Sequence, residues 1–222
     1  MIMIRNLSDA FARMSGMPIN SKNGRNVLKQ AGIDTNSAQY KAVMRHMSKA
    51  AGAGVAYTNP EAIKNLMRNY DSDGDRIDPV TGLSGLVVTD KNRASKNRII
   101  SIPESSREEM FELAKKEFLR ESGINNGDTT KRGDVYTNLY RKMQKNDRLA
   151  AGHTLSQYER AYRQAFVDAV KSVNPKWEVG KPIPSGALDG VSRESIENSL
   201  VKSGSNLVKK NPSSCSSLDI QI

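Results

Sequence analysis

The sequence predicts a mainly α protein of about six helices around one core, with a small two-stranded β-hairpin. Two observations predict this class. Apolar residues recur at spacings of three and four along much of the chain, which is the period of one helical face. Only two short runs are rich in β-branched residues, and they follow one another in the chain, as the strands of a hairpin do.

The first 16 residues predict a short amphipathic helix. Its apolar face consists of Ile4, Leu7, Phe11 and Met14. Gly16 and Pro18 then interrupt the pattern. We therefore assign residues 1–20 to an N-terminal arm and residues 21–202 to a single helical domain.

Two further helices are predicted before residue 71. The first spans about residues 36–50 and ends at a run of Ala and Gly. The second, residues 59–70, has strong start signals. Asn59 is a suitable N-cap, Pro60 fits the first turn, and Glu61 complements the positive end of the helix dipole. This helix runs directly into an aspartate-rich loop at residues 71–78.

The predicted hairpin pairs residues 86–89 with residues 98–102, and Pro103 ends its second strand. Four helices are predicted after it, from Ser105 to about residue 121, around residues 135–143, from Thr154 to residue 173, and over residues 192–201. Residues 203–222 are rich in Ser, Asn and Lys and predict a disordered tail.

Bulk properties exclude several kinds of protein. No apolar run is long enough for a transmembrane helix, and Arg5 and Asp9 interrupt the place where a signal peptide needs an apolar core. The protein is expected in the cytoplasm, or exported without a classical signal peptide. Cys215 is the only cysteine, so no intrachain disulfide forms. His46 and His153 lie too far apart in sequence to suggest a zinc site.

The aspartate-rich loop is the clearest candidate site. Asp71, Asp73 and Asp75 stand at alternate positions, Gly74 relieves the turn between them, and Asp78 adds a fourth carboxylate. Calcium prefers six to eight oxygen ligands, and a bound cation would offset the repulsion among these acids. These four aspartates are therefore the predicted calcium ligands. The alternative is an empty surface turn that the aspartate side chains stabilise through backbone hydrogen bonds.

The Asp71-x-Asp73-Gly-Asp75 pattern resembles the start of an EF-hand loop, and also dockerin and thrombospondin type 3 calcium loops. The preceding helix at 59–70 is similar to an entering EF-hand helix. The pattern then departs from the EF-hand. Arg76 replaces the glycine at position six, and Gly82 replaces the bidentate glutamate at position twelve. The resemblance therefore implies a shortened or altered calcium loop.

The same aspartates also resemble the first motif of haloacid-dehalogenase-type phosphatases. That resemblance implies a metal-dependent hydrolase in which Asp71 is the nucleophile and Asp73 the acid. The motif follows a buried strand in that family, whereas the residues before Asp71 have helical patterning.

The formal charge of +10 is compatible with an acidic partner, although charge of this kind is usually just solvated surface. Two basic segments, residues 91–98 and 131–148, are candidates for binding nucleic acid. Tyr136 and Tyr140 interleave with the basic residues of the second segment, and a basic helix with aromatics can lie along phosphates. The alternative, which we favour, is that the two tyrosines are half-buried and the basic residues are solvated.

Three stretches, Asn69–Leu86, Ile99–Glu104 and Asp147–Gly152, resemble an uncharacterised protein family of Gram-positive bacteria. The resemblance implies a bacterial origin and no particular activity. The leading functional hypothesis is therefore a non-catalytic calcium-binding structural or interaction protein. Its basic surface would bind an acidic partner, and the ion would fix the helix at 59–70 to the hairpin. Nucleic-acid binding and metal-dependent hydrolysis are the alternatives.

Overall fold

The computed structural model describes residues 17–18, 22–50, 57–58, 60–124 and 129–210. The chain divides into two units, Met1–Val87 and Val88–Ile222. The stretch predicted as one domain, residues 21–202, is thus shared between two units. The predicted helix at residues 1–16 lies outside the described residues.

The first unit contains three helices, α2 (Lys22–Gln30), α3 (Ala38–Ala50) and α4 (Pro60–Met67), and two short antiparallel strands, β1 (Met17–Pro18) and β2 (Tyr57–Thr58). Leu28, Ile33, Tyr40 and Ile63 form its buried cluster, with Met44, Met47 and Met67 packed against them. The predicted helices at 36–50 and 59–70 are confirmed as α3 and α4, although α4 ends earlier. Helix α2 was not predicted from its sequence.

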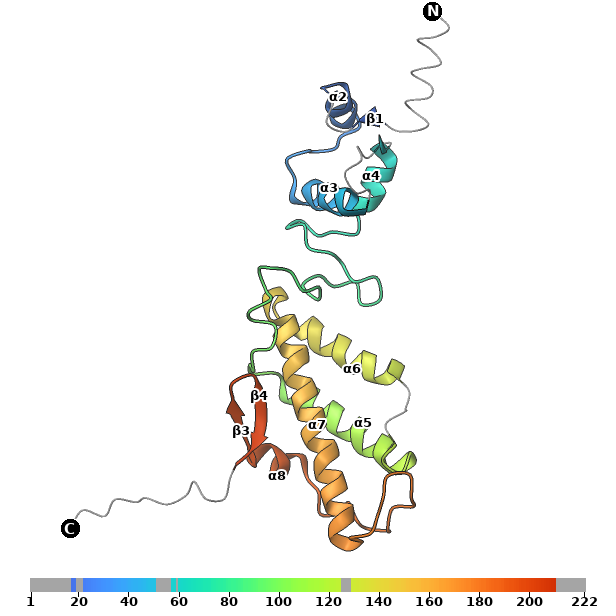
Figure 1. Cartoon of the computed structure of the whole chain (residues 1–222), viewed down its shortest axis with the longest axis vertical. Coiled ribbons are helices and arrows are strands. Elements are labelled where there is room, and N and C mark those ends of the chain that lie inside the picture. The colour runs from blue at the N-terminus through green and yellow to red at the C-terminus, as the bar shows by residue number, and fades with distance from the viewer. Residues whose placement is uncertain (1–16, 19–21, 51–56, 59, 125–128, 211–222) are drawn as a thin grey trace, which may run out of the picture. The chain divides into compact units, whose positions relative to one another are not determined.

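The second unit is a helical bundle. Its elements are α5 (Glu104–Arg120), α6 (Thr129–Lys142), the 3₁₀ helix η1 (Lys145–Asp147), α7 (Arg148–Val173), α8 (Arg193–Asn198), β3 (Leu200–Ser203) and β4 (Asn206–Lys209). Helix α7 is the long central element, with α5 and α6 on one side and α8 and the β3–β4 hairpin on the other (Figure 1). Among the described residues, no helix is both long and apolar enough to cross a membrane.

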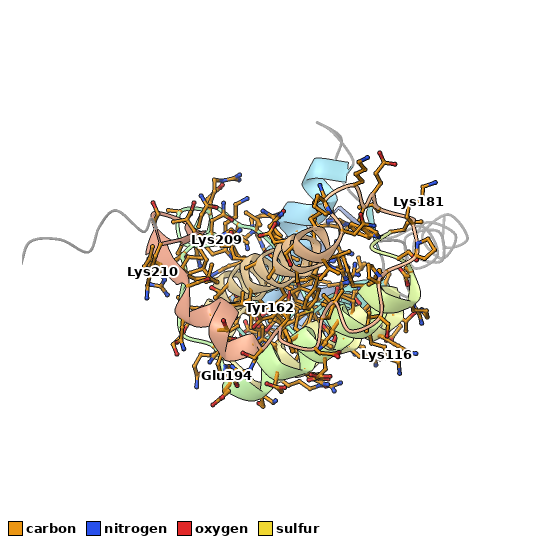
Figure 2. All side chains as sticks on the ribbon, turned by 90° about the horizontal axis from the view of Figure 1, so that it is seen from below. Lys116, Tyr162, Lys181, Glu194, Lys209 and Lys210 are labelled. Atoms are coloured by element: carbon orange, nitrogen blue, oxygen red, sulfur yellow. The ribbon has the colours of Figure 1, made fainter. Side chains whose placement is uncertain are left out.

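Aromatic side chains fill the centre of this bundle. Phe111 packs edge-on against Tyr162 with ring centroids 5.3 Å apart, and Phe118 lies 5.5 Å from Phe166. Trp177, which follows α7, folds back onto Phe118. Figure 2 shows Tyr162 in the interior, between the helices. Helices α5 and α7 supply these rings at helical spacing. The helix predicted from Ser105 to about residue 121 is confirmed as α5. The start predicted at Thr154 is wrong, because α7 begins six residues earlier at Arg148 and Thr154 is buried within it.

Buried ion pairs also join the helices of the bundle. Glu117 of α5 is 2% exposed. Its Oε2 accepts hydrogen bonds from Arg132 of α6 at 2.7 Å and from Arg163 of α7 at 2.8 Å. Arg193 of α8 is similarly buried and donates to Glu104 and Glu108 of α5. A buried carboxylate requires such partners, since an unpaired charge is costly away from water.

The fold class is confirmed, but the hairpin lies elsewhere than predicted. Residues 86–89 and 98–102 form no strands. Instead, Ile102 is buried in the bundle core, and the Ile100 backbone N–H donates to the Thr154 hydroxyl of α7 at 3.1 Å. The β-branched run is therefore extended because it packs against a helix.

The observed hairpin pairs Leu200–Ser203 with Asn206–Lys209, and Gly204 in its turn has a φ of 60°. The prediction of disorder from residue 203 is therefore wrong for residues 203–209. The short helix predicted at 192–201 ends at Asn198, where the chain turns into β3. Residues 211–222 lie outside the described part of the chain.

Candidate functional site

The aspartate-rich loop follows α4 and is closed by its own backbone. The Asp71 N–H donates to the Asp75 carbonyl at 2.9 Å, and the Gly74 N–H donates to the Asp71 carbonyl at 2.9 Å. The Ile77 N–H reaches back to the Asn69 carbonyl at 2.8 Å. The loop is thus a tight, internally bonded turn.

The side chains of Asp71 and Asp78 accept hydrogen bonds from neighbouring backbone and hydroxyl groups. Asp71 Oδ1 accepts from the N–H groups of Asp73 at 3.0 Å and Asp75 at 2.9 Å. Asp78 Oδ1 accepts from the Thr81 N–H at 2.8 Å and the Thr81 hydroxyl at 2.9 Å. These bonds lower the pKa of Asp78, because they favour its ionised form. This is the hydrogen-bonding pattern expected of aspartates that stabilise turns.

Gly74 has a role that its sequence context did not reveal. Its φ is 78°, and a Cβ built there would lie 2.6 Å from the Ala38 carbonyl oxygen of α3. The Gln39 side chain also donates to the Tyr70 carbonyl at 2.9 Å. The loop is therefore held against the first residues of α3, and the close backbone approach requires glycine.

Within the described ranges, no group of three or more His, Cys, Asp or Glu side chains is placed to hold a metal ion. Asp71, Asp73, Asp75 and Asp78 share one loop, and calcium binding by them stays a prediction. The described sheets are two-stranded and antiparallel. Asp71 follows a helix and turn rather than a buried strand, which does not favour the hydrolase alternative.

The second candidate site is basic and lies in the second unit. Residues 89–98 form successive turns, in which the Arg93 N–H donates to the Thr89 carbonyl at 3.0 Å and the Arg98 N–H to the Ser95 carbonyl at 3.1 Å. Lys91 and Arg93 are exposed on this segment, and Lys96 is half-buried. The turns thus concentrate several cations in a few residues.

This segment is bound to η1, the short 3₁₀ helix between α6 and α7. Arg98 Nη2 lies 2.8 Å from Asp147 Oδ1, although the two residues are 49 positions apart in the chain. The Lys202 amine of β3 donates to the Ile99 carbonyl at 3.2 Å. The hairpin turn is held by a 2.6 Å contact between His153 Nε2 and the Ser205 carbonyl. Segments far apart in sequence therefore meet at the N-terminal end of α7 (Figure 1).

We call this surface the basic end. It consists of Lys91, Arg93, Lys96, Arg98, Arg141, Lys142, Lys145, Arg148 and Lys202. The acidic side chains within the same segments are Asp90 and Asp147. Lys202 was not predicted to belong to a basic surface, because it stands alone beside a segment predicted as the end of a helix.

The structure divides the predicted basic segment 131–148. Arg132 pairs with Glu117 inside the bundle, so only the part from Arg141 onward belongs to the basic end. The two tyrosines also point into the bundle. The Tyr136 hydroxyl donates to Glu159 at 3.4 Å, and burial raises its pKa. The Tyr140 ring packs so closely on Gly152 that a Cβ there would lie 2.5 Å from its hydroxyl. Both tyrosines are half-buried, as the alternative interpretation of this segment expected, so their rings do not lie beside the cations of the basic end.

Together these features define a mainly helical protein with one concentrated basic surface and one hydrogen-bonded acidic loop. Residues 33–222 match the family described as a domain of unknown function, DUF3879, and the chain belongs to that family. The match supports the predicted membership of an uncharacterised family. Gram-positive origin and the likeness to calcium loops stay predictions. No curated protein and no solved structure matches the chain.

Proposed function

We propose that this protein is a non-catalytic interaction protein that binds an acidic partner through the basic end. The observation that carries the proposal is the ion pair between Arg98 and Asp147. It brings residues 91–98 and 141–148 together, so that two basic segments become one surface. Residues 89–98, residues 141–148 and Lys202 together contain nine Lys and Arg residues and two Asp residues, Asp90 and Asp147.

Carboxylates in the first two turns of α5 are engaged by other partners, and Glu109 accepts from the Asn138 amide of α6. Glu104 and Glu108, at the start of that helix, are both paired with Arg193. Cations held close together repel one another, and a multiply charged anion would relieve that repulsion. This surface is therefore better suited to an acidic partner than to plain solvent.

The buried ionisable groups support binding rather than catalysis. Glu117 joins α5, α6 and α7, and Arg193 joins α8 to α5. The Tyr162 hydroxyl donates to Glu197 at 2.6 Å, which adds a link between α7 and α8. Each of these groups is engaged in holding helices together, so their burial has a structural explanation.

Elution from a heparin column tests the proposal. The test variant combines Lys91→Gln, Lys96→Gln and Arg141→Gln, which removes three cations and leaves the Arg98–Asp147 pair in place. The control combines Lys116→Gln, Lys176→Gln and Lys181→Gln. These three lysines are exposed and lie elsewhere on the unit, and Figure 2 labels the first and the last of them.

The two triple variants have the same net charge. We expect the wild type and the control to elute at similar salt concentrations, and the test variant to elute at a clearly lower one. Equal elution of the two variants would show that net charge alone governs binding, and would refute a site at the basic end.

Calcium binding remains part of the proposal at the aspartate-rich loop. The ion was expected to fix the helix at 59–70 to a hairpin at residues 86–102, and that hairpin is absent. The loop instead contacts the start of α3 through Gly74 and Gln39. A bound ion would therefore brace α4 against α3.

A further inference from the structure

We infer that the acidic partner is a nucleic-acid duplex, held through its backbone phosphates without preference for base sequence. The inference rests on the proposed function and specifies its partner. Three features of the basic end support it: the elements that form the surface, the position of the aromatic rings, and the lack of apolar side chains among the cations.

The surface consists of turns and helix ends, apart from Lys202 of the β3–β4 hairpin, whose amine donates to the Ile99 carbonyl. Residues 89–98 are a series of turns, and η1 spans only the three residues Lys145–Asp147. Arg141 and Lys142 belong to the last turn of α6. Base edges in the major groove are usually read by an α-helix or a β-ribbon that enters the groove. Lysines and arginines on turns and helix ends are instead suited to phosphate oxygens, which carry no sequence information.

The aromatic rings of the unit are unsuited to stacking on unpaired bases. Tyr136 and Tyr140 pack within the bundle, and Tyr158 stacks on Tyr162 at a centroid distance of 6.2 Å. Across residues 88–124 and 129–210, no aromatic residue is exposed. Proteins that bind single strands generally rely on such rings together with a basic groove. The basic end offers only the charge, and this favours a duplex.

The basic end also lacks the apolar centre typical of protein–protein contacts. Two large exposed hydrophobic residues of the described chain, Val88 and Val201, adjoin the segments of the basic end, but none falls within residues 89–98 or 141–148. Protein interfaces depend on buried aromatic or aliphatic anchors at their centre. A duplex needs none, because it presents about one negative charge per 1.7 Å of its length.

Fluorescence anisotropy with the full chain tests this inference. The probes are a labelled 20-base-pair DNA duplex of mixed sequence, a second duplex of shuffled sequence, one of the single strands, and a labelled poly-glutamate peptide. We expect the two duplexes to bind equally and more tightly than the other probes. If about four to six phosphates are contacted, raising the salt from 50 to 200 mM should weaken duplex binding about 100- to 1,000-fold.

The two triple variants then locate the binding surface. Replacing Lys91, Lys96 and Arg141 with Gln should reduce the slope of log affinity against log salt by about 3, since each lost phosphate contact reduces it by about 1. The Lys116, Lys176 and Lys181 control should keep the wild-type slope. The last two lysines follow the C-terminal end of α7, whereas the basic end lies at its N-terminal end, and this 26-residue helix is about 39 Å long.

The outcomes separate this inference from the proposed function. Retention on heparin together with equal or tighter binding of the single strand or of poly-glutamate would overturn the duplex inference and leave the proposed function intact. A clear difference between the two duplexes would overturn the claim of sequence-independent binding. If the wild type neither stays on heparin nor binds the duplexes, both proposals are overturned.

Discussion

Replacing Gly74 with alanine tests how the aspartate-rich loop is held in the first unit. A side chain in the left-handed region costs about 1–2 kcal/mol. At Gly74 the φ is 78°, and the new Cβ would also lie 2.6 Å from the Ala38 carbonyl oxygen. Relieving that overlap requires the loop or α3 to shift, which typically costs another 1–3 kcal/mol, roughly the range for an overpacked site. We therefore expect Gly74→Ala to destabilise the unit by about 2–5 kcal/mol.

Gly82 provides a matched control. Its φ is 69°, and a Cβ there meets no described atom within 4 Å. Gly82→Ala should therefore cost only the backbone strain, about 1–2 kcal/mol. The comparison isolates the contact with Ala38, because both substitutions add one methyl group in the same backbone region.

Hydrogen exchange of the α3 and α4 amides, followed in a chelating buffer, is the appropriate assay. The chain has two units, so one melting curve for the whole protein would not report on this unit alone. We expect Gly74→Ala to lose clearly more protection in α3 and α4 than Gly82→Ala. Equal loss in both variants would refute the reasoning, because the close approach to Ala38 would then contribute nothing.

Three further predictions concern the bundle and the loop. Glu117→Ala should lower the free energy of unfolding of the second unit by about 3–5 kcal/mol, measured by hydrogen exchange of the α5 and α7 amides, because Arg132 and Arg163 lose a buried partner, whereas exposed Glu112→Ala should change it little. Burial and the Glu197 hydrogen bond raise the pKa of Tyr162, so its contribution to stability should be present below about pH 10 and lost as the pH rises above it. Tyr162→Phe should weaken that alkaline loss, and an unchanged pH profile would contradict this. If the loop binds calcium, titration with millimolar calcium should produce heat and stabilise the wild type, and Asp71→Asn should remove both effects. The absence of both effects in the wild type would exclude the site.

Helical periodicity and start signals in the amino-acid sequence locate α3, α4 and α5 to within a few residues, but they place the start of α7 six residues late. Such patterns are local, since a helix needs only neighbouring residues to satisfy its backbone. The hairpin was misplaced because strand formation depends on a partner. The run at Ile99–Ile102 has strand composition but packs against α7, whereas the polar segment around Gly204 folds back on itself.

The candidate sites likewise combine features that are visible in the sequence with features that only the fold decides. The four aspartates were found from spacing alone, yet the use of Asp71 and Asp78 as backbone acceptors depends on how the loop closes. The basic segments were also visible in sequence. Their composition did not reveal that Arg132 is buried against Glu117, because that contact joins two helices.

The amino-acid sequence by itself determined the helical class, the acidic loop and the excess of positive charge. These properties follow from composition and from patterns within a few residues. Only the tertiary structure decided which cations share one surface and why Gly74 must be glycine. The Arg98–Asp147 pair and the approach of Gly74 to Ala38 each bring together residues distant in the chain, and only packing places them in contact.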